Sequence, residues 1–247
     1  MTKTTHHDIV KEMQALNNPA KAVLSVRFFK TGKGQYGYGD KFLGLTVPAT
    51  RLLARKYKHC SIDDLKILIK NPWHEIRLAA LIIAVEQFKE GDDVIKRQLF
   101  QFYVANTAYI NNWDLVDLSA HHIVGPAAEL FDKTILTKLA QSSQLWEKRI
   151  AIVATFHFIR LKRSKETFQI ADMLIADSHD LMHKAVGWML REVGKRVSEE
   201  TLEAYLKKHY HTMPRTTLRY AIERFSPTRR QEYLKGDRKS TRLNSSH

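Results

Sequence analysis

The sequence predicts an all-α protein built as a superhelix of stacked helical hairpins. Three observations lead to this prediction: helix-capping residues recur along the chain, almost no segment alternates apolar and polar residues as a strand does, and the connections are short and polar. Short connections between helices of about ten to eighteen residues make consecutive helices antiparallel neighbours. With 44% hydrophobic residues among 247, the chain can bury a substantial core.

The individual helices are indicated by their first and last residues. Ile9, Met13 and Leu16 lie at helical spacing, and the pattern stops at residues 17–19, so the first helix should end there. A second helix is expected over residues 20–30. Later helix starts are predicted from Thr46 before Pro48, Ser61 with Asp64 three residues later, Asn71 before Pro72, Ser143, Ser178, Ser198, and Ser226 before Pro227.

Residues 31–40 contain four glycines and two tyrosines. A phosphate-binding loop is disfavoured, because no Gly-Lys-Ser/Thr follows the glycines and no strand is predicted before them. We expect instead a mobile loop between helices, in which Tyr36 and Tyr38 are available to contact a ligand.

A short motif repeats along the chain, in which a basic or aromatic residue precedes a small apolar run. It occurs at Arg77, Trp113, Arg149, Lys184 and Arg215, at intervals of 36, 36, 35 and 31 residues. This interval fits two helices with two turns and lies near the period of HEAT-type arrays. Such hairpins stack into a curved solenoid, with the start of each second helix along one edge of the concave face. The sequence therefore predicts HEAT-like repeats with a concave basic face.

The charge of the chain restricts its partners. It carries 40 Lys and Arg against 26 Asp and Glu, a formal net charge of +14, which favours a polyanionic partner such as nucleic acid. No apolar run approaches the ~20 residues of a membrane span, and the N-terminus has no signal-peptide core, so we expect a soluble, cytoplasmic protein that does not act at a membrane. The single cysteine, Cys60, excludes an internal disulfide and a multi-cysteine metal site.

We expect one domain over residues 1–235. Residues 236–247 are polar and without periodicity, and they are interpreted as a non-native, vector-derived segment or a disordered tail. They hold three basic residues and one acidic one, so without them the formal charge falls only from +14 to +12. The preference for a polyanionic partner therefore does not depend on them.

The segment 111–125 places acidic residues among apolar ones on a predicted helix of a basic protein. Trp113 and Asp117 are four residues apart and should project side by side, with His121 one turn further on. The buried stripe on another side of this helix is predicted to consist of Leu115, Leu118 and Ile123. The indole and the carboxylate are then left to face out of the core.

The two aspartates of this helix are given different roles. A carboxylate facing DNA phosphates lowers affinity, so Asp117 is better explained by catalysis than by binding. Asp114 is interpreted as structural, because an acidic residue near a helix N-terminus meets the helix dipole favourably. A metal site made by these aspartates with His121 and His122 is disfavoured, since the spacing is not a zinc signature; we expect no metal and no cofactor.

A second candidate surface is a stripe of residues spaced four, three and four. It consists of Lys184, Trp188, Arg191 and Lys195 on a helix predicted over residues 182–194. Cations alternating with an indole suit a nucleic-acid backbone, with the cations on phosphates and the ring on a sugar or base. The alternative for Trp188 is core packing, the role assigned to Trp73 and Trp146.

Three motifs occur in order along the chain: Trp-Asp-Leu-Val-Asp at 113–117, Trp-Glu-Lys-Arg-Ile-Ala at 146–151, and Lys-Ala-Val-Gly-Trp-Met-Leu-Arg-Glu at 184–192. Together they resemble the core motifs of the AlkD-like DNA alkylation repair glycosylases. The resemblance extends from the N-terminal helices through Phe225. It implies a HEAT-like solenoid that wraps duplex DNA and excises positively charged alkylated purines, such as N3-methyladenine or N7-methylguanine, without a base-flipping pocket. We expect such a protein to act as a monomer.

The resemblance also implies roles for single residues. Asp117 matches the catalytic aspartate, Trp113 and Trp188 match the two tryptophans that flank the deoxyribose of the lesion, and Arg149 matches the active-site arginine, which would hold a backbone phosphate. Further DNA contacts are expected from Lys148, Lys184, Arg191 and Arg215. The loop 31–40 has no assigned counterpart.

Two other functions are consistent with parts of the sequence. One is a non-catalytic HEAT-like module that binds unusual DNA or RNA structures by charge and shape, in which Asp117 has no catalytic role. The other is a protein-binding HEAT scaffold, which leaves the basic stripe unexplained. A non-catalytic module would release no base, whereas a glycosylase would. A protein-binding scaffold would show little dependence of binding on salt, whereas a nucleic-acid-binding protein would show a strong one.

Overall fold

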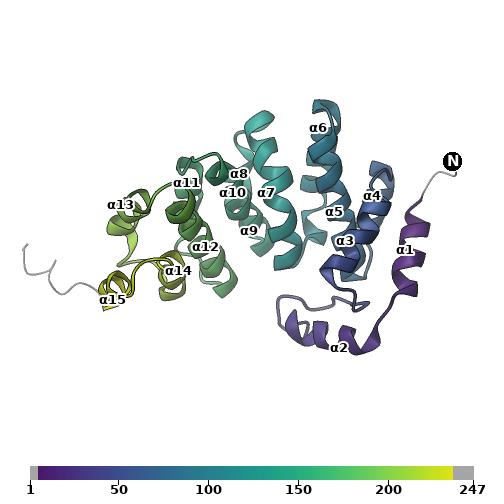
Figure 1. The fold of residues 1–247 in the computed structure, drawn as a ribbon, viewed down its shortest axis with the longest axis horizontal. Helices are drawn as coiled ribbons and strands as arrows, with labels where there is room; N and C mark the ends of the chain where they lie inside the picture. The colour runs from purple at the N-terminus through teal and green to yellow at the C-terminus, as the bar shows by residue number, and fades with distance from the viewer. Residues whose placement is uncertain (1–4, 236–247) are drawn as a thin grey trace, which may run out of the picture. The chain divides into compact units, whose positions relative to one another are not determined.

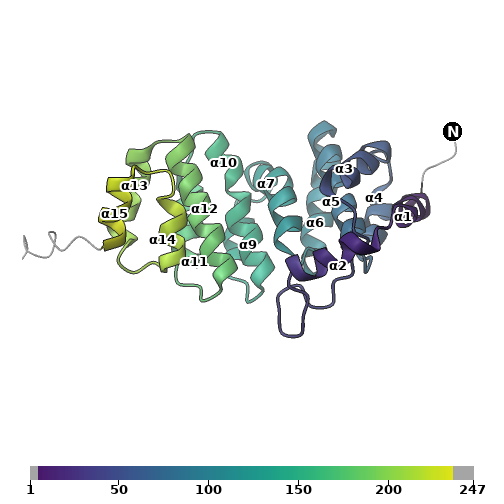
Figure 2. The same ribbon diagram turned by 60° about the horizontal axis from the view of Figure 1, so that its bottom comes forward.

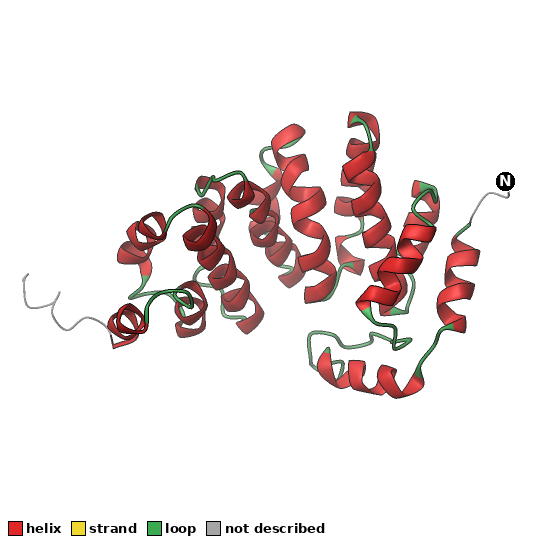
Figure 3. Cartoon of the chain, viewed as in Figure 1, coloured by secondary structure: helices red, strands yellow, loops and turns green. Residues whose placement is uncertain are grey.

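The computed structural model describes residues 5–235, and within them the chain forms α-helices and one short 3₁₀ helix but no β-strand (Figures 1 and 3). An isolated bridge joins Lys41 and Trp73. The predicted all-α class is thus confirmed. None of the described helices is long and apolar enough to cross a membrane. The predicted tail, residues 236–247, lies outside the described residues.

The chain divides into two compact units, the first ending at Thr134 and the second beginning at Ile135. The first unit contains α1 (His6–Ala15), α2 (Pro19–Phe28), α3 (Val47–Lys56), α4 (Ile62–Leu68), α5 (His74–Glu90), α6 (Asp93–Ala105), η1 (Thr107–Tyr109) and α7 (Trp113–Leu130). The second contains α8 (Ile135–Ala140), α9 (Leu145–Ala154), α10 (Phe156–Arg160), α11 (Lys165–Leu174), α12 (Asp180–Arg196), α13 (Glu199–His209), α14 (Arg215–Ala221) and α15 (Pro227–Lys235). The expectation of a single domain stays a prediction.

Helix α5 lies at the centre of the first unit. It packs against four helices of this unit, α3, α4, α6 and α7. Of these, α4 and α6 also contact each other. Residues on almost every side of α5 are therefore buried, among them the fully buried Ile76, Leu81 and Ile83. A helix that is apolar all round needs such enclosure.

Helix α12 has the same central position in the second unit, where it packs against α9, α10, α11, α13 and α14. Its approach to α14 is close, and the two helices lie side by side in Figures 1 and 2. A Cβ atom added to Gly187 would lie 2.5 Å from the Cβ of Tyr220 and 2.6 Å from the carbonyl oxygen of Thr217. Glycine is required here by the distance between two backbones.

The predicted repeat corresponds to real helix starts. Its five positions, Arg77, Trp113, Arg149, Lys184 and Arg215, all fall within the first five residues of α5, α7, α9, α12 and α14. Within the units, α5 packs against α7, α9 against α12, and α12 against α14. Packing of successive second helices confirms the helical repeat. A concave basic face shared along the chain stays a prediction.

Four of the predicted helix caps are confirmed. The side chains of Thr46, Ser61, Ser198 and Ser226 each accept a hydrogen bond from the backbone amide three residues further on. At Ser61 the carboxylate of Asp64 completes a capping box. The first two helices also form, although α2 ends two residues earlier than expected, before Lys30 adopts a positive φ of 51°.

Three predicted caps were wrong by one or two residues. The N-cap of α5 is Trp73 rather than Asn71, that of α9 is Gln144 rather than Ser143, and that of α12 is His179 rather than Ser178. The side chain of Asn71 instead forms a turn before the helix, accepting from the amide of Trp73 at 3.0 Å. At α12 the imidazole of His179 accepts from Leu181 N at 3.1 Å, a role that the sequence pattern did not suggest.

We predict that Gly187→Ala destabilises the protein by about 1–3 kcal/mol, because the added methyl group must push α14 away from α12. This cost exceeds the roughly 0.5–1 kcal/mol that alanine gains over glycine within a helix. Urea denaturation measures the change. Gly32→Ala is the matched control, since its Cβ would approach only the flexible side chain of Gln35, at 3.0 Å. Equal stability of the two variants would contradict the prediction.

Candidate active site

The candidate residues of the first unit lie at the start of α7. Its N-cap is Asn112, whose side chain accepts from Trp113 N at 2.9 Å. Trp113 and Asp117 are both half-buried, one turn apart on the side of α7 away from the buried Leu115 and Ile123. The sequence prediction of two faces is thus confirmed for these residues.

The predicted buried stripe on α7 was partly wrong. Leu118 is only half-buried, whereas Leu115 and Ile123 are fully buried. Leu118 lies with His122 in a small groove of about 50 Å³ whose other walls come from α3 and α5. The core-facing side of α7 is instead completed by small residues such as Ala120.

The indole of Trp113 rests on an aromatic cluster. Phe29 stacks on it with ring centroids 5.5 Å apart, and Phe28 meets it edge-on at 5.7 Å. Phe29 also stacks on Phe42 at 5.1 Å and contacts the imidazole of His74 at 4.9 Å. Trp113 therefore has a fixed support made by the end of α2, the following loop and the start of α5.

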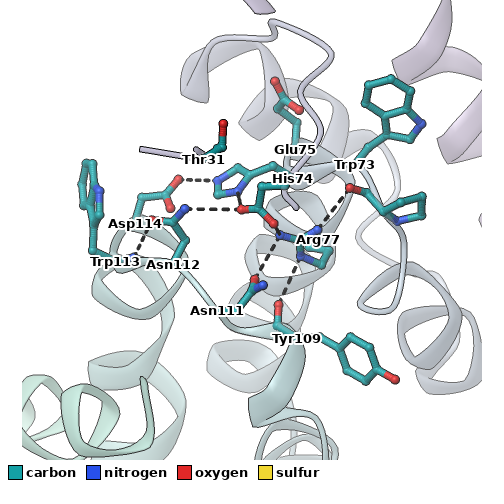
Figure 4. A network of polar contacts seen from close by, with 12 residues as sticks. Thr31, Trp73, His74, Glu75, Arg77, Tyr109, Asn111, Asn112, Trp113 and Asp114 are labelled. Atoms are coloured by element: carbon teal, nitrogen blue, oxygen red, sulfur yellow. Dashed lines mark hydrogen bonds and ion pairs between the residues drawn. The ribbon is translucent and has the colours of Figure 1, made fainter. Parts of the chain in front are cut away.

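A buried network of charged groups meets this cluster at His74, and Figure 4 shows its polar contacts. The imidazole of His74, 1% exposed, faces Asp40 through Nδ1 at 3.1 Å and Asp114 through Nε2 at 2.8 Å. Arg77 donates to the second oxygen of Asp40 at 2.6 Å, and the side-chain amide of Asn112 donates to Asp40 at 3.3 Å. Two acidic and two basic side chains thus join the loop before α3 to the first turns of α5 and α7.

The guanidinium of Arg77 also fixes the turn that leads into α7. It donates to the carbonyl oxygens of Tyr109 and Asn71, each at 3.1 Å, and to the side chain of Asn111 at 3.1 Å (Figure 4). All of these acceptors come from segments without regular structure or at helix ends. In this setting Asp114 has a structural contact, in agreement with the role interpreted from the sequence.

The glycine-rich loop packs closely against this network. A Cβ atom on Gly37 would lie 2.4 Å from the carbonyl oxygen of Phe29 and 3.4 Å from the side-chain nitrogen of Asn112, so the loop backbone meets the cap of α7 directly. Gly34 and Gly39 have φ values of 78° and 90°, which other residues rarely adopt. Tyr38 is 66% exposed, so its ring remains accessible.

A second buried carboxylate, missed in the sequence, holds the next part of this loop. Glu75 is 3% exposed and accepts from the backbone amides of Leu43 at 2.9 Å, Gly44 at 2.8 Å and Leu45 at 3.2 Å. Three amide N–H groups that point at a carboxylate stabilise it by hydrogen bonding. No local pattern could have indicated it, because its partners lie about 30 residues earlier in the chain.

The network alters the protonation of its members. Burial alone would lower the pKa of His74, but the hydrogen bonds to Asp114 and Asp40 outweigh it and raise that pKa from 6.5 to about 9. Burial would likewise raise the pKa of Asp40, but the hydrogen bond from His74 and the charge of Arg77 hold it below 3.8. At neutral pH His74 is thus an imidazolium and Asp40 a carboxylate.

The two histidines of α7 lie beside each other. His121 and His122 contact each other, with ring centroids 3.9 Å apart. Among residues 5–235, no three His, Cys, Asp or Glu side chains are placed to hold a metal ion together.

The stripe predicted for the second unit lies on the side of α12 that the core does not cover. Lys184, Trp188 and Arg191 are half-buried and Lys195 is exposed, while most residues between them, such as Met189, are buried. The ring of Trp188 lies near that of Phe156, with ring centroids 6.3 Å apart. The four residues therefore form a stripe as predicted, and Trp188 is not a core residue.

The predicted DNA-binding cations are engaged within the protein. Arg149 is 5% exposed and donates to the carbonyl oxygen of Leu181 at 2.7 Å, which holds α9 against the start of α12. The others pair as follows: Lys148 with Asp177, Lys184 with Asp180 at 2.7 Å, Arg191 with Glu223, and Arg215 with the carbonyl oxygen of Leu234. Contact of these cations with DNA stays a prediction.

Two further arginines were missed in the sequence. Arg51 and Arg55 lie four residues apart on α3, are exposed, and border the small groove that contains Leu118 and His122 of α7. Neither makes an ion pair within the part of the chain that the structure describes. Their i, i+4 spacing was the available signal, but α3 lies before the repeat that organised the prediction.

The sequence profile of a family described as DNA alkylation repair enzyme matches residues 9–225. The chain belongs to the DNA alkylation repair enzyme family. The predicted resemblance is thus confirmed at the level of the family. A comparison with curated proteins gives no match.

A solved structure shares the fold of this family member. It is the predicted DNA alkylation repair enzyme from Enterococcus faecalis, which is similar to this chain with a TM-score of 0.65 and 17% sequence identity. The similarity covers 85% of this chain and 97% of the other. At this identity the comparison supports the fold and assigns no residue a role.

The buried network leads to a pH dependence of stability. The pKa of His74 is higher in the folded protein than in an unfolded chain, so its contribution is complete below pH 6.5 and is lost as the pH rises through about 9. We predict that the free energy of unfolding of the wild type falls over this range by roughly 3 kcal/mol. The contribution of Asp40 is present above pH 3.8 and is lost on acidification.

Urea denaturation at a series of pH values tests this prediction. His74→Gln cannot bind the proton, so its stability should change much less between pH 6.5 and 9.5. Parallel curves for the wild type and His74→Gln would show that His74 is not charged in the folded protein.

Proposed function

We propose that this family member is a DNA glycosylase that excises positively charged alkylated purines, N3-methyladenine and N7-methylguanine, from duplex DNA in base excision repair. The observation that carries the proposal is the pair on α7: a supported indole at Trp113 and a carboxylate one turn further on at Asp117, both outside the core. Membership of a DNA alkylation repair family supplies the class of substrate.

The chemistry of an alkylated purine fits these two side chains. Alkylation at N3 or N7 gives the base a positive charge, so it leaves readily and needs no general acid. Positive charge then develops on the deoxyribose as the glycosidic bond breaks. A fixed carboxylate and the face of an indole both stabilise such a charge, and the carboxylate of Asp117 can also orient or deprotonate the attacking water.

The second unit would supply the other contacts with the lesion and its backbone. In this proposal Trp188 lies against the deoxyribose, as Trp113 does, and the two lysines and the arginine of the α12 stripe contact phosphates. The ion pairs of Lys184 and Arg191 have to open for this. The pair of Lys184 with Asp180 lies at the surface, where an ion pair contributes only about 0–1 kcal/mol, so a phosphate can replace Asp180 at little cost.

The role of Arg149 differs from that of the cations on the α12 stripe. Because its guanidinium is buried against the carbonyl oxygen of Leu181, it holds the N-terminus of α12 in place. Contact of this guanidinium with a backbone phosphate is proposed from the sequence resemblance alone. Arg51 and Arg55 add phosphate contacts beside α7.

We predict that Asp117→Asn lowers the rate of base release by about 10²–10³, the scale for loss of one preorganised electrostatic group. Binding should be unchanged or slightly tighter, because a negative charge facing phosphates is removed. The measurement is release of N7-methylguanine from duplex DNA with enzyme in excess, alongside the dissociation constant for the same duplex. Asp63→Asn, at an exposed carboxylate of α4, is the control and should release base as the wild type does.

The alternative functions give different results in this assay. A non-catalytic module that reads DNA shape would bind DNA in both forms and release no base in either. Equal release by the wild type and Asp117→Asn would remove Asp117 from the mechanism. A protein-binding scaffold would bind DNA weakly and with little dependence on salt.

We predict that replacing Arg51 and Arg55 with glutamine lowers the slope of log K against log salt by about 1.8, since each phosphate contact contributes about 0.9. Binding should weaken uniformly across DNA sequences. The control removes the same charge elsewhere, in Lys207→Gln with Lys208→Gln on α13, and should leave the slope nearly unchanged. An unaltered slope in the arginine variant would exclude α3 from the DNA interface.

A further inference from the structure

The geometry around His74 requires a charged imidazole. Nδ1 lies 3.1 Å from Asp40 and Nε2 lies 2.8 Å from Asp114, so each ring nitrogen faces a carboxylate oxygen. A neutral imidazole has only one N–H and would direct a lone pair at the other carboxylate. An imidazolium donates both hydrogen bonds and balances the second negative charge.

The same imidazole supports the candidate active site from a second direction. It stacks on Phe42 with centroids 4.8 Å apart and contacts Phe29 at 4.9 Å. Phe29 in turn stacks on Trp113 at 5.5 Å. His74 is thus joined to the start of α7 twice, through a hydrogen bond to Asp114 and through one intervening ring to the neighbouring Trp113.

These two connections act on adjacent residues of one helical turn. The hydrogen bond to Asp114 fixes the rotation of the first turn of α7, and Asp117 follows three residues later on the same helix. The aromatic contact fixes the plane of the indole.

We propose that His74 is a positioning residue of the excision reaction: as an imidazolium between Asp40 and Asp114 it holds the first turn of α7, and with it Trp113 and Asp117, in the geometry that base release requires. This inference rests on the proposed glycosylase function. His74 is buried and does not touch DNA. Replacing His74 should therefore change the rate of base release and not the affinity for DNA.

The charged groups around His74 define the expected pH response. From the loop it faces Asp40, from α7 it faces Asp114, and on its own helix it lies near Arg77, which also pairs with Asp40. Glu75 is engaged by the amides of the loop. With two carboxylates against one neighbouring cation, the proton on His74 is retained through neutral pH and lost near pH 9.

The test compares the wild type, His74→Gln and Asp114→Asn by single-turnover release of N7-methylguanine from duplex DNA between pH 6 and 10, with spontaneous release subtracted. All proteins are assayed well below their melting temperatures, and the dissociation constant for DNA is measured in parallel. His6→Gln is the matched control, since His6 pairs with Asp64 at 2.8 Å away from α7.

We expect both network variants to lose about 10- to 100-fold in the rate of release, the scale for a small misplacement of reacting groups, while the dissociation constant changes less than threefold. The wild-type rate should fall as the pH rises through about 9, and the His74→Gln rate should not. His6→Gln should match the wild type.

The outcomes separate the two proposals. If the wild type releases base but His74→Gln has the same rate and pH profile, the role of His74 is wrong and the glycosylase function stands. If the wild type releases no base at any pH, both are wrong. Should either variant fail to fold, the ¹⁵N shifts of the two ring nitrogens of His74 in the wild type decide: a neutral ring at pH 7, or a wild-type rate that stays constant through pH 10, overturns the inference.

Discussion

The arrangement of the first unit depends on the pairing of Asp40 with two cations. Its two oxygens bind His74 and Arg77, and those side chains bind Asp114 and the turn before α7. Removing each such charge from water costs several kcal/mol, and only a complete set of partners compensates this. The network is therefore best understood as a device that fixes geometry: any displacement of the loop, α5 or α7 leaves a buried charge without its partner.

The second unit fixes the start of its central helix by other means. Arg149 donates to the backbone at Leu181, the imidazole of His179 caps α12, and Lys148 pairs with Asp177 just before it. In both units a helix that bears a candidate tryptophan begins at a point held by charged side chains from the preceding repeat. The glycine at position 187 then brings α14 against α12, so the helix that bears the stripe is closely packed next to it.

Much of this structure follows from local sequence signals, and the rest does not. The all-α class, the repeat and the capping at Ser61 and Ser198 depend on residues a few positions apart, so the sequence was sufficient to predict them. The half-buried position of Trp113 and Asp117 followed from helical periodicity. The roles of His74 and Glu75 could not be foreseen, because their partners lie 30 or more residues away. A spacing pattern likewise could not show which carboxylates pair with the cations of α12.

The closure of the loop before α3 has a consequence for the order of folding. The contact between Asn112 and Asp40 spans 72 residues of sequence, whereas packing among α4, α5 and α6 involves neighbouring segments. Contacts between neighbouring segments lose less chain entropy and form sooner than distant ones. We expect the helical framework to assemble first and the loop to dock last. The surface around Trp113 would then be the final part of the first unit to be completed, so a chain that has already gained most of its helical structure would still lack the support on which its candidate chemistry relies.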